Sequence, residues 1–319
     1  MTTDHALHTV AAVDIGSNTF HLAIGQVAKN GKKLTIVKRH VELIRLGADV
    51  TKTGAIGEER AARGEATLQH MAKLAKDAGA EVLLGMATEG VRAASNAVEM
   101  LSRFGAALGT PVVLLSGLEE AALTFWGAAS QADDPLAALA VGDLGGGSCE
   151  IVTGVAGCIS WACSLPLGSG RLADSLPDID HPTAADFERL GEQAKGVLVS
   201  VAIPPQPVQT LIAVGGTATS LLRLLPHPTA NGMLHRDDIV HIMHLLQEQP
   251  LTAISQQYSV DIERVRLFTG GSVAWYEILT WLGIDSMYVS ERGVREGAML
   301  AWAQAGDGWQ QFAHTATGV

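Results

Sequence analysis

The sequence predicts an α/β protein of two domains, each with a mostly parallel sheet covered by helices. Apolar segments typical of strands alternate with segments of helical periodicity, and this order indicates parallel sheets. The order β-β-β-α-β-α occurs twice, with extra helices in the second copy. The 319 residues suffice for two ordinary cores. We therefore expect domains over residues 1–129 and 130–319, and the last helix could return to the first domain.

Residue periodicity places the elements along the chain. Strands are expected at residues 10–13, 20–27, 33–41, 81–86, 112–115, 139–141, 150–155, 210–214 and 286–289. Helices are expected at residues 58–78, 96–108, 119–129, 184–199, 215–225, 236–247, 262–282 and 294–305. Residues 310–319 carry no such pattern and are expected to be frayed.

The composition limits the classes of function. With 47% hydrophobic and 17% charged residues, the chain suits a well-packed soluble protein. Its net charge of −11 excludes a broad electrostatic footprint on nucleic acid. A polyanionic substrate would need local basic residues and metal ions. No apolar run is long enough to span a bilayer, and the first residues lack a secretion signal, so no membrane association is expected.

The cysteine pattern indicates a reducing compartment. The three cysteines, Cys149, Cys158 and Cys163, contain no C-x-x-C pair. A cytoplasmic setting is the simplest interpretation of this odd number. Each cysteine is expected to be a small buried apolar residue.

Two segments share one pattern, in which an aspartate ends an apolar strand and a glycine turn with a hydroxyl residue follows. The first is DIGSNTFHL from Asp14, and the second is DLGGGSCE from Asp143. Backbone N–H groups in glycine turns form anion-binding concavities, and Mg²⁺ can bridge a carboxylate to phosphate. A pair of ordinary Asp-Gly hairpin turns is the alternative. Because the pattern occurs twice, we favour two phosphate-holding turns that face each other.

Other segments could serve the same chemistry. SGLEEA from Ser116 places Glu119 and Glu120 at a helix start, where either could orient water or simply favour the helix N-terminus. VGGT from Val214 indicates either an anion site or close packing of strand and helix. No P-loop motif occurs, and residues 145–147 do not fit the dinucleotide fingerprint. The arginines near loops that could clamp a phosphate are Arg45, Arg92, Arg171 and Arg295.

In their joint order these motifs resemble the exopolyphosphatase / guanosine pentaphosphate phosphohydrolase (Ppx/GppA) family in its short, two-domain form. The similarity runs from about residue 10 to residue 300 and includes REG from Arg295. It implies two ribonuclease-H-like domains of the actin-like ATPase superfamily that flank a cleft. A homodimer is suggested by the resemblance alone.

The resemblance also implies roles for single residues. Glu120 corresponds to the catalytic base, while Asp143 and Glu150 resemble the metal and active-site carboxylates. Asp14 in the first turn is a further candidate ligand for Mg²⁺. The candidate phosphate-binding residues are Gly16, Ser17, Asn18, Arg92, Gly145, Gly146, Gly147, Ser148, Gly215, Gly216 and Thr217.

Three features depart from the family pattern. Cys149 stands where threonine is usual, between two functional side chains, and little loss is expected from it. Glu89 occupies a position where small or neutral residues are common. The sequence stops at Val319, whereas longer members continue into helical domains that help bind long polyphosphate. High processivity is therefore not expected.

We expect an Mg²⁺-dependent exopolyphosphatase, a phosphoanhydride hydrolase that removes the terminal phosphate of inorganic polyphosphate with a water oriented by Glu120. Hydrolysis of guanosine pentaphosphate is the main alternative, because nothing in the sequence selects a guanine pocket. An actin-like kinase and a non-catalytic sensor of nucleotide or polyphosphate are less favoured, since the glutamate pair and the carboxylates suit hydrolysis.

Overall fold

The structure is a computed structural model that describes residues 7–31, 33–131, 138–155, 157–204, 207–225 and 232–316. The chain divides into two compact units. Unit 1 comprises Met1–Leu136, Gly157–Ala162 and Arg292–Val319, and unit 2 comprises Ala137–Ala156 and Cys163–Glu291. Unit 1 thus extends past the expected range of residues 1–129 and includes the last helices of the chain.

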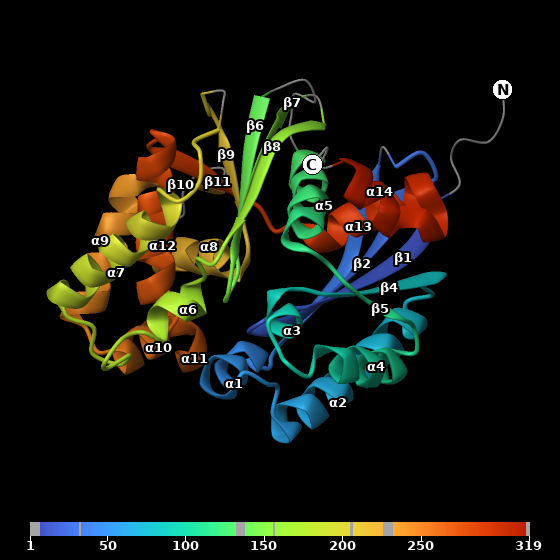
Figure 1. Ribbon diagram of the computed structural model, residues 1–319, viewed down its shortest axis with the longest axis horizontal. Helices are drawn as coiled ribbons and strands as arrows, with labels where there is room; N and C mark the ends of the chain where they lie inside the picture. Colours follow the sequence, from blue (N-terminus) through green and yellow to red (C-terminus); the bar gives the residue numbers. More distant parts are fainter. Residues whose placement is uncertain are drawn as a thin grey trace. The chain divides into compact units, whose positions relative to one another are not determined.

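Unit 1 contains a five-stranded sheet in the order β3-β2-β1-β4-β5 (Figure 1). The strands β1, β2 and β3 are antiparallel neighbours, whereas β4 and β5 run parallel to β1. The sheet is mixed and not mostly parallel, because tight turns return a strand antiparallel while helical crossovers return it parallel. The strands are β1 (Leu7–Ile15), β2 (Thr19–Ala28), β3 (Leu34–Leu43), β4 (Val82–Ala87) and β5 (Val112–Leu114).

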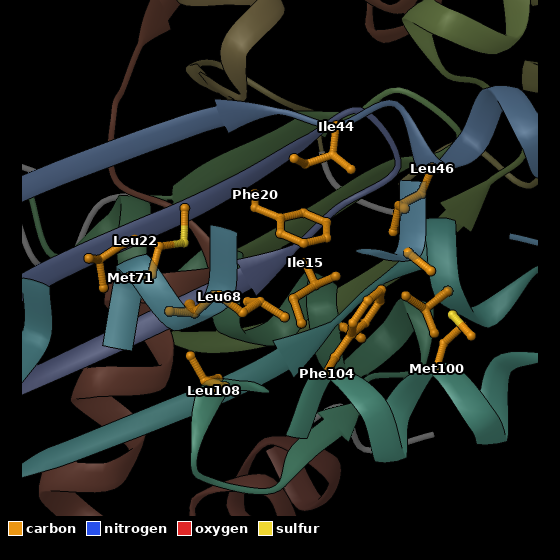
Figure 2. Close-up of a cluster of buried hydrophobic side chains, with 14 of the residues drawn as sticks. Ile15, Phe20, Leu22, Ile44, Leu46, Leu68, Met71, Met100, Phe104 and Leu108 are labelled. Atoms are coloured by element: carbon orange, nitrogen blue, oxygen red, sulfur yellow. The ribbon is translucent and has the colours of Figure 1, made fainter. Parts of the chain in front are cut away.

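Helices cover both faces of this sheet, because β1 is apolar on both sides. Its side chains alternate between two cores: Val13 and Ile15 join one, and Val10 and Ala12 join the other. Figure 2 shows the first core, where Phe20 meets Phe104 edge to face with ring centroids 5.8 Å apart. The helices of unit 1 are α1 (Leu46–Thr53), α2 (Glu58–Asp77), α3 (Glu89–Arg92), α4 (Ala97–Leu108), α5 (Gly117–Ala129), α13 (Val294–Ala305) and α14 (Trp309–Ala316).

The chain's last described helix, α14, was not expected. Residues 309–316 are helical, so the prediction of a frayed tail over residues 310–319 is wrong for this part, and residues 317–319 lie outside the described residues. Trp309 and Ala313 are buried, and the Phe312 ring lies 5.1 Å from that of Trp126 on α5. The apolar residues at spacings of three and four give α14 one face for the core.

The helices α5 and α13 approach each other through glycine. A Cβ added at Gly297 would lie only 1.7 Å from the carbonyl oxygen of Leu123, and one at Gly127 would lie 2.0 Å from that of Gly293. Two backbones are therefore in direct contact at both positions. Only glycine permits this distance.

Unit 2 contains a six-stranded mixed sheet in the order β10-β11-β9-β6-β7-β8, except that residues 158–162 at the start of β8 are assigned to unit 1. The pairs β6–β7 and β10–β11 are antiparallel, whereas β6–β9 and β9–β11 are parallel. The repeated β-β-β order implied a third strand here, but no residue range was predicted for β8, and β10 was not expected. The strands are β6 (Ala138–Leu144), β7 (Cys149–Val155), β8 (Cys158–Leu165), β9 (Leu211–Val214), β10 (Met233–His235) and β11 (Ser286–Val289).

The helices of unit 2 surround α12, which is nearly inaccessible to solvent along most of its length. The expected helix over residues 262–282 is two helices, and the chain between them carries Arg266, which forms a bidentate ion pair with Asp180. The helices are α6 (Ser169–Ala173), α7 (Ala184–Leu198), α8 (Gly216–Leu221), α9 (Arg236–Glu248), α10 (Leu251–Tyr258), α11 (Ile262–Val265) and α12 (Phe268–Leu282).

The described residues bear on the expectations about membrane-spanning segments and about the cysteines. None of the helices described is both long and apolar enough to cross a membrane. All three cysteines are unpaired, and Cys149 and Cys163 are buried as expected. Cys158 is exposed, so its prediction as a buried residue is wrong.

A buried carboxylate on α12 predicts a pH-dependent stability. Burial raises the pKa of Glu277 above its usual value, although the Lys195 Nζ lies 3.9 Å away. The folded state therefore favours the neutral acid, so unfolding becomes easier as the pH rises through this pKa. Glu277→Gln should raise the Tm at pH 8 by about 2–4 °C, and this gain should vanish at pH 4.

Thermal denaturation between pH 4 and pH 8 measures this effect. Glu188→Gln is the matched control, since Glu188 is exposed on the neighbouring helix α7. An equal gain for both variants, or a gain for Glu277→Gln that persists at low pH, would contradict the role of burial.

Candidate functional site

In unit 2, the triple-glycine loop (residues 145–148) joins β6 to β7, and its carbonyl groups are fixed by the segment that begins α6. Gly145 O accepts hydrogen bonds from the Ser169 N–H and hydroxyl at 2.9 and 3.1 Å. Gly146 O and Gly147 O accept hydrogen bonds from Arg171, through its backbone N–H and its Nε, both at 2.9 Å. Three consecutive carbonyls thus point the same way.

The N–H groups of this loop consequently point away from α6. In a trans peptide the N–H lies opposite the preceding carbonyl, so the N–H groups of Gly146, Gly147 and Ser148 share the other side. Within the described parts of the chain, none of them donates a hydrogen bond to a backbone oxygen. Three convergent N–H dipoles form the kind of concavity that binds an anion.

Glycine at position 168 allows this arrangement. A Cβ there would lie 2.3 Å from Gly146 O and 2.5 Å from Gly147 N. The backbone before α6 therefore lies directly against the loop and holds it from behind. No sequence pattern predicts this contact, because Gly168 lies far from the loop in sequence and belongs to none of the motifs.

Two carboxylates lie beside the loop. Asp143 and Glu150 are direct cross-strand partners on β6 and β7, so their side chains share one face of the sheet. Glu150 is 2% exposed and its Oε1 accepts a 2.7 Å hydrogen bond from the Ser164 hydroxyl on β8. Ser164 therefore fixes Glu150 and is a second residue that sequence reasoning did not find.

The segment of residues 215–217 lies next to these carboxylates. Gly215 has φ 102°, and a Cβ there would lie 3.1 Å from Asp143 Oδ1 and 2.8 Å from Leu144 O. Thr217 is buried in the first turn of α8. The structure thus brings the triple-glycine loop, both carboxylates and residues 215–217 together within unit 2.

An arginine that the sequence analysis did not single out completes this region. A Cβ at Gly216 would lie 3.5 Å from Arg264 Nη1, and that nitrogen donates a 3.2 Å hydrogen bond to the Ser220 hydroxyl. Burial lowers the pKa of Arg264, and the nearby positive charge of Arg223 adds to this effect. The cation is thus partly desolvated, a condition under which an anion is bound more strongly.

Cys149, between Ser148 and Glu150, does not supply a nucleophile. Burial, together with the charge of Glu150, raises the pKa of the Cys149 thiol well above its usual value. Burial also raises the pKa of Cys163 to about 12. Both thiols stay protonated near neutral pH and behave as small apolar groups.

In unit 1, the N-terminal turn (residues 16–18) is fixed in a similar way. Ser17 O accepts a hydrogen bond from Gly47 N, and Asn18 O accepts hydrogen bonds from Ile44 N and Arg45 N, all at 2.8 Å. Arg45 adopts a left-handed conformation, with φ 63°, to allow this pairing. Because the Ser17 carbonyl faces this segment, the Asn18 N–H faces the opposite side.

The helix α3 lies against the N-terminal turn through Gly90. A Cβ at this position would lie 2.5 Å from Ser17 Cα. The carbonyl of Ile15, which follows Asp14, accepts a 3.2 Å hydrogen bond from Thr88 N. This contact places the turn beside the helix that carries Arg92.

The two glutamates at the start of α5 have different environments. Glu119 forms a capping box with Ser116: Ser116 N donates to its carboxylate at 2.8 Å and Glu119 N donates to the Ser116 hydroxyl at 3.2 Å. Glu120 is not part of this cap. Its Oε2 lies 3.2 Å from Arg92 Nη1, and the same nitrogen donates a 2.6 Å hydrogen bond to Leu115 O. The capping interpretation therefore applies to Glu119.

Each of the four arginines considered has a contact within the protein, and none of these contacts tests a role as a phosphate clamp. Arg171 holds the triple-glycine loop through its Nε, and Arg295 lies 3.9 Å from the buried Glu296. Arg92 is paired with Glu120, and Arg45 shapes the N-terminal turn. A direct contact with phosphate remains a prediction for Arg92.

The residues of unit 2 fit a magnesium ion. The described residues contain no cluster of three or more His, Cys, Asp or Glu side chains that could hold a metal. Mg²⁺, however, commonly uses one or two carboxylates and takes its other ligands from water and substrate phosphates. The cross-strand pair of Asp143 and Glu150, beside an anion-binding loop, has this donor chemistry.

Two α/β units, each with a mixed sheet and a glycine turn after its first strand, define a two-domain α/β protein. The model of the Ppx/GppA phosphatase family matches residues 26–305, which is most of the chain. The chain therefore belongs to the Ppx/GppA phosphatase family.

Solved structures agree with this assignment. The PPX-GPPA enzyme of Aquifex aeolicus is 28% identical, with a TM-score of 0.76 over 93% of this chain and 100% of that chain. An exopolyphosphatase-like protein is 26% identical, with a TM-score of 0.85 over 93% and 98%. An exopolyphosphatase from Cytophaga hutchinsonii has a TM-score of 0.84 over 93% and 98%, and at 21% identity it shows the fold alone.

Proposed function

We propose that this phosphatase is an Mg²⁺-dependent exopolyphosphatase that releases the terminal phosphate of inorganic polyphosphate. The observation that carries the proposal is the set of N–H groups in residues 146–148, which are turned to one side next to Asp143 and Glu150. N–H groups fixed before the reaction can stabilise the charge on phosphoryl oxygens without reorganisation. The exopolyphosphatase-like relative at 26% identity supports the same substrate class.

The proposed roles divide between the units. In unit 2, the triple-glycine loop and residues 215–217 bind phosphoryl oxygens, and Asp143 and Glu150 would hold Mg²⁺. The ion, when bound, offsets the negative charge of the phosphate chain. In unit 1, residues 16–18 bind phosphate, Asp14 is a further ligand candidate, and Arg92 contacts phosphate while it holds Glu120.

Glu120 orients the attacking water in this mechanism. The water oxygen forms a bond to the terminal phosphorus as the bridging P–O bond breaks in line with it. The water proton passes to the Glu120 carboxylate, and the products are inorganic phosphate and a chain shortened by one unit. Arg92, whose Nη1 lies 3.2 Å from the carboxylate, holds Glu120 in place for this transfer.

Phosphate release by the purified chain tests the proposal. Tripolyphosphate, a polyphosphate of medium length and a long one are each supplied with MgCl₂ or with EDTA, and kcat/KM is compared with that for guanosine pentaphosphate. We expect Mg²⁺-dependent release from polyphosphate, with the higher kcat/KM for polyphosphate. The family assignment leaves these substrates open, so the comparison decides between them.

Each other outcome contradicts the proposal in a defined way. A higher kcat/KM for guanosine pentaphosphate would make the protein a guanosine pentaphosphate phosphohydrolase. Formation of ADP from ATP that requires an added acceptor would indicate a kinase. Tight binding of polyphosphate without any turnover would indicate a sensor.

A further inference from the structure

The buried helix α12 contacts both candidate anion-binding segments of unit 2 through two adjacent glycines. A Cβ at Gly270 would lie 2.4 Å from Ser169 O and 2.9 Å from Ala173 N, both on α6. A Cβ at Gly271 would lie 2.2 Å from Thr217 Cγ2 on α8. Real Cβ atoms do not occur at such distances, so at Gly270 the backbone of α6, and at Gly271 the buried Thr217 side chain of α8, would have to move to admit any other residue.

The residue that each glycine contacts either supports or belongs to one of the two candidate anion-binding segments. Ser169, which is 1% exposed, donates two hydrogen bonds to Gly145 O, so a displacement of α6 displaces the triple-glycine loop. Thr217 belongs to the segment whose Gly215 lies against Asp143. One turn of α12 is therefore in contact with the supports of both segments.

We infer that Gly271 is a positioning residue, and that the glycine pair of α12 sets the distance between the triple-glycine loop and residues 215–217. The inference rests on the proposed function, because the distance matters only if both segments bind one phosphate chain. A shift of about 1 Å in a binding group can reduce catalysis by about a hundredfold. The methyl group of alanine at this position would force a shift of that order.

The test compares Gly271→Ala with the double variant Gly271→Ala/Thr217→Ser and with Thr217→Ser alone. Serine keeps the hydroxyl and removes the Cγ2 atom that the new methyl group would meet. We expect Gly271→Ala to raise the KM for tripolyphosphate about ten- to a hundredfold in the wild-type background. In the Thr217→Ser background the same substitution should change KM by less than about threefold.

A matched control separates positioning from loss of folded protein. Gly196→Ala makes the same substitution in helix α7, where no atom lies within 4 Å of the added Cβ, and it should leave KM unchanged. A purely structural defect lowers the folded fraction, so it reduces the apparent kcat and leaves the KM of the surviving enzyme unchanged. Thermal denaturation of every variant reports the folded fraction.

The possible failures are distinguishable. If the wild-type protein releases no phosphate from tripolyphosphate, the proposed function fails. If the wild-type protein is active but Gly271→Ala leaves KM unchanged, or if Thr217→Ser does not restore it, the positioning role of Gly271 is wrong while the function stands.

Discussion

Glu120→Gln is expected to reduce kcat for phosphate release by about 10²–10⁴, because a general base contributes on this order. The amide has the size of the carboxylate and still accepts a hydrogen bond from Arg92, so the fold should be retained. It cannot take the proton of the attacking water. The KM should change much less than kcat, because the substitution removes none of the residues proposed to bind phosphate.

Glu119→Gln is the matched control for this prediction, since the two glutamates are adjacent and are both 8% exposed. Glutamine serves in a capping box as glutamate does, so helix α5 should begin normally and kcat should stay near that of the wild type. Initial rates at saturating tripolyphosphate measure both variants. A wild-type kcat in Glu120→Gln, or an equal reduction of kcat in both variants, would contradict the proposal that Glu120 is the general base.

Gly297→Ala is expected to destabilise the protein by about 1–3 kcal/mol or more, the usual cost of overpacking a core. Alanine normally stabilises a helix interior relative to glycine by about 0.5–1 kcal/mol. The change in the free energy of unfolding is therefore expected to have the opposite sign from that of an ordinary glycine-to-alanine substitution in a helix. The reversal is expected because the methyl group would lie 1.7 Å from the Leu123 carbonyl oxygen. A backbone cannot rotate away as a side chain can.

Thermal and chemical denaturation measure this loss of stability. Gly196→Ala is again the control, because no atom lies within 4 Å of the Cβ added there. The control should be as stable as the wild type or more stable. A Tm for Gly297→Ala equal to that of the wild type would show that α5 and α13 can separate at little cost.

The same contact explains a motif that the sequence analysis used only as a signature. In REG from Arg295, the glycine permits the approach of α13 to α5. The glutamate, Glu296, is fully buried, where it accepts hydrogen bonds from Gly293 N at 2.9 Å and Arg39 Nη1 at 2.5 Å. These positions are constrained by packing in unit 1.

Local patterns predicted much of the fold. Both Asp-Gly turns and their flanking strands were expected, because turn chemistry and strand periodicity act over a few residues. Strand direction and some short elements were missed. The strand β10 has three residues, which is too short to show a period, and α14 needs its contacts with α5 to be stable.

The candidate site was only partly accessible from sequence. The sequence could not separate Glu119 from Glu120, because the difference depends on Arg92, which lies 28 positions away. Gly168 and Ser169 support the triple-glycine loop from more than 20 positions away. Such residues are recognised by what they touch, and no local pattern marks them.

Unit 1 is assembled from segments at the two ends of the chain, and this has a consequence for biosynthesis. The residues of unit 2 leave the ribosome before Arg292–Val319, so the apolar face formed by Val10 and Ala12 lacks α13 and α14 throughout that time. At ordinary translation rates the delay is on the order of ten seconds. We expect the nascent protein to require chaperone protection during this interval, and chains that terminate before α13 to aggregate.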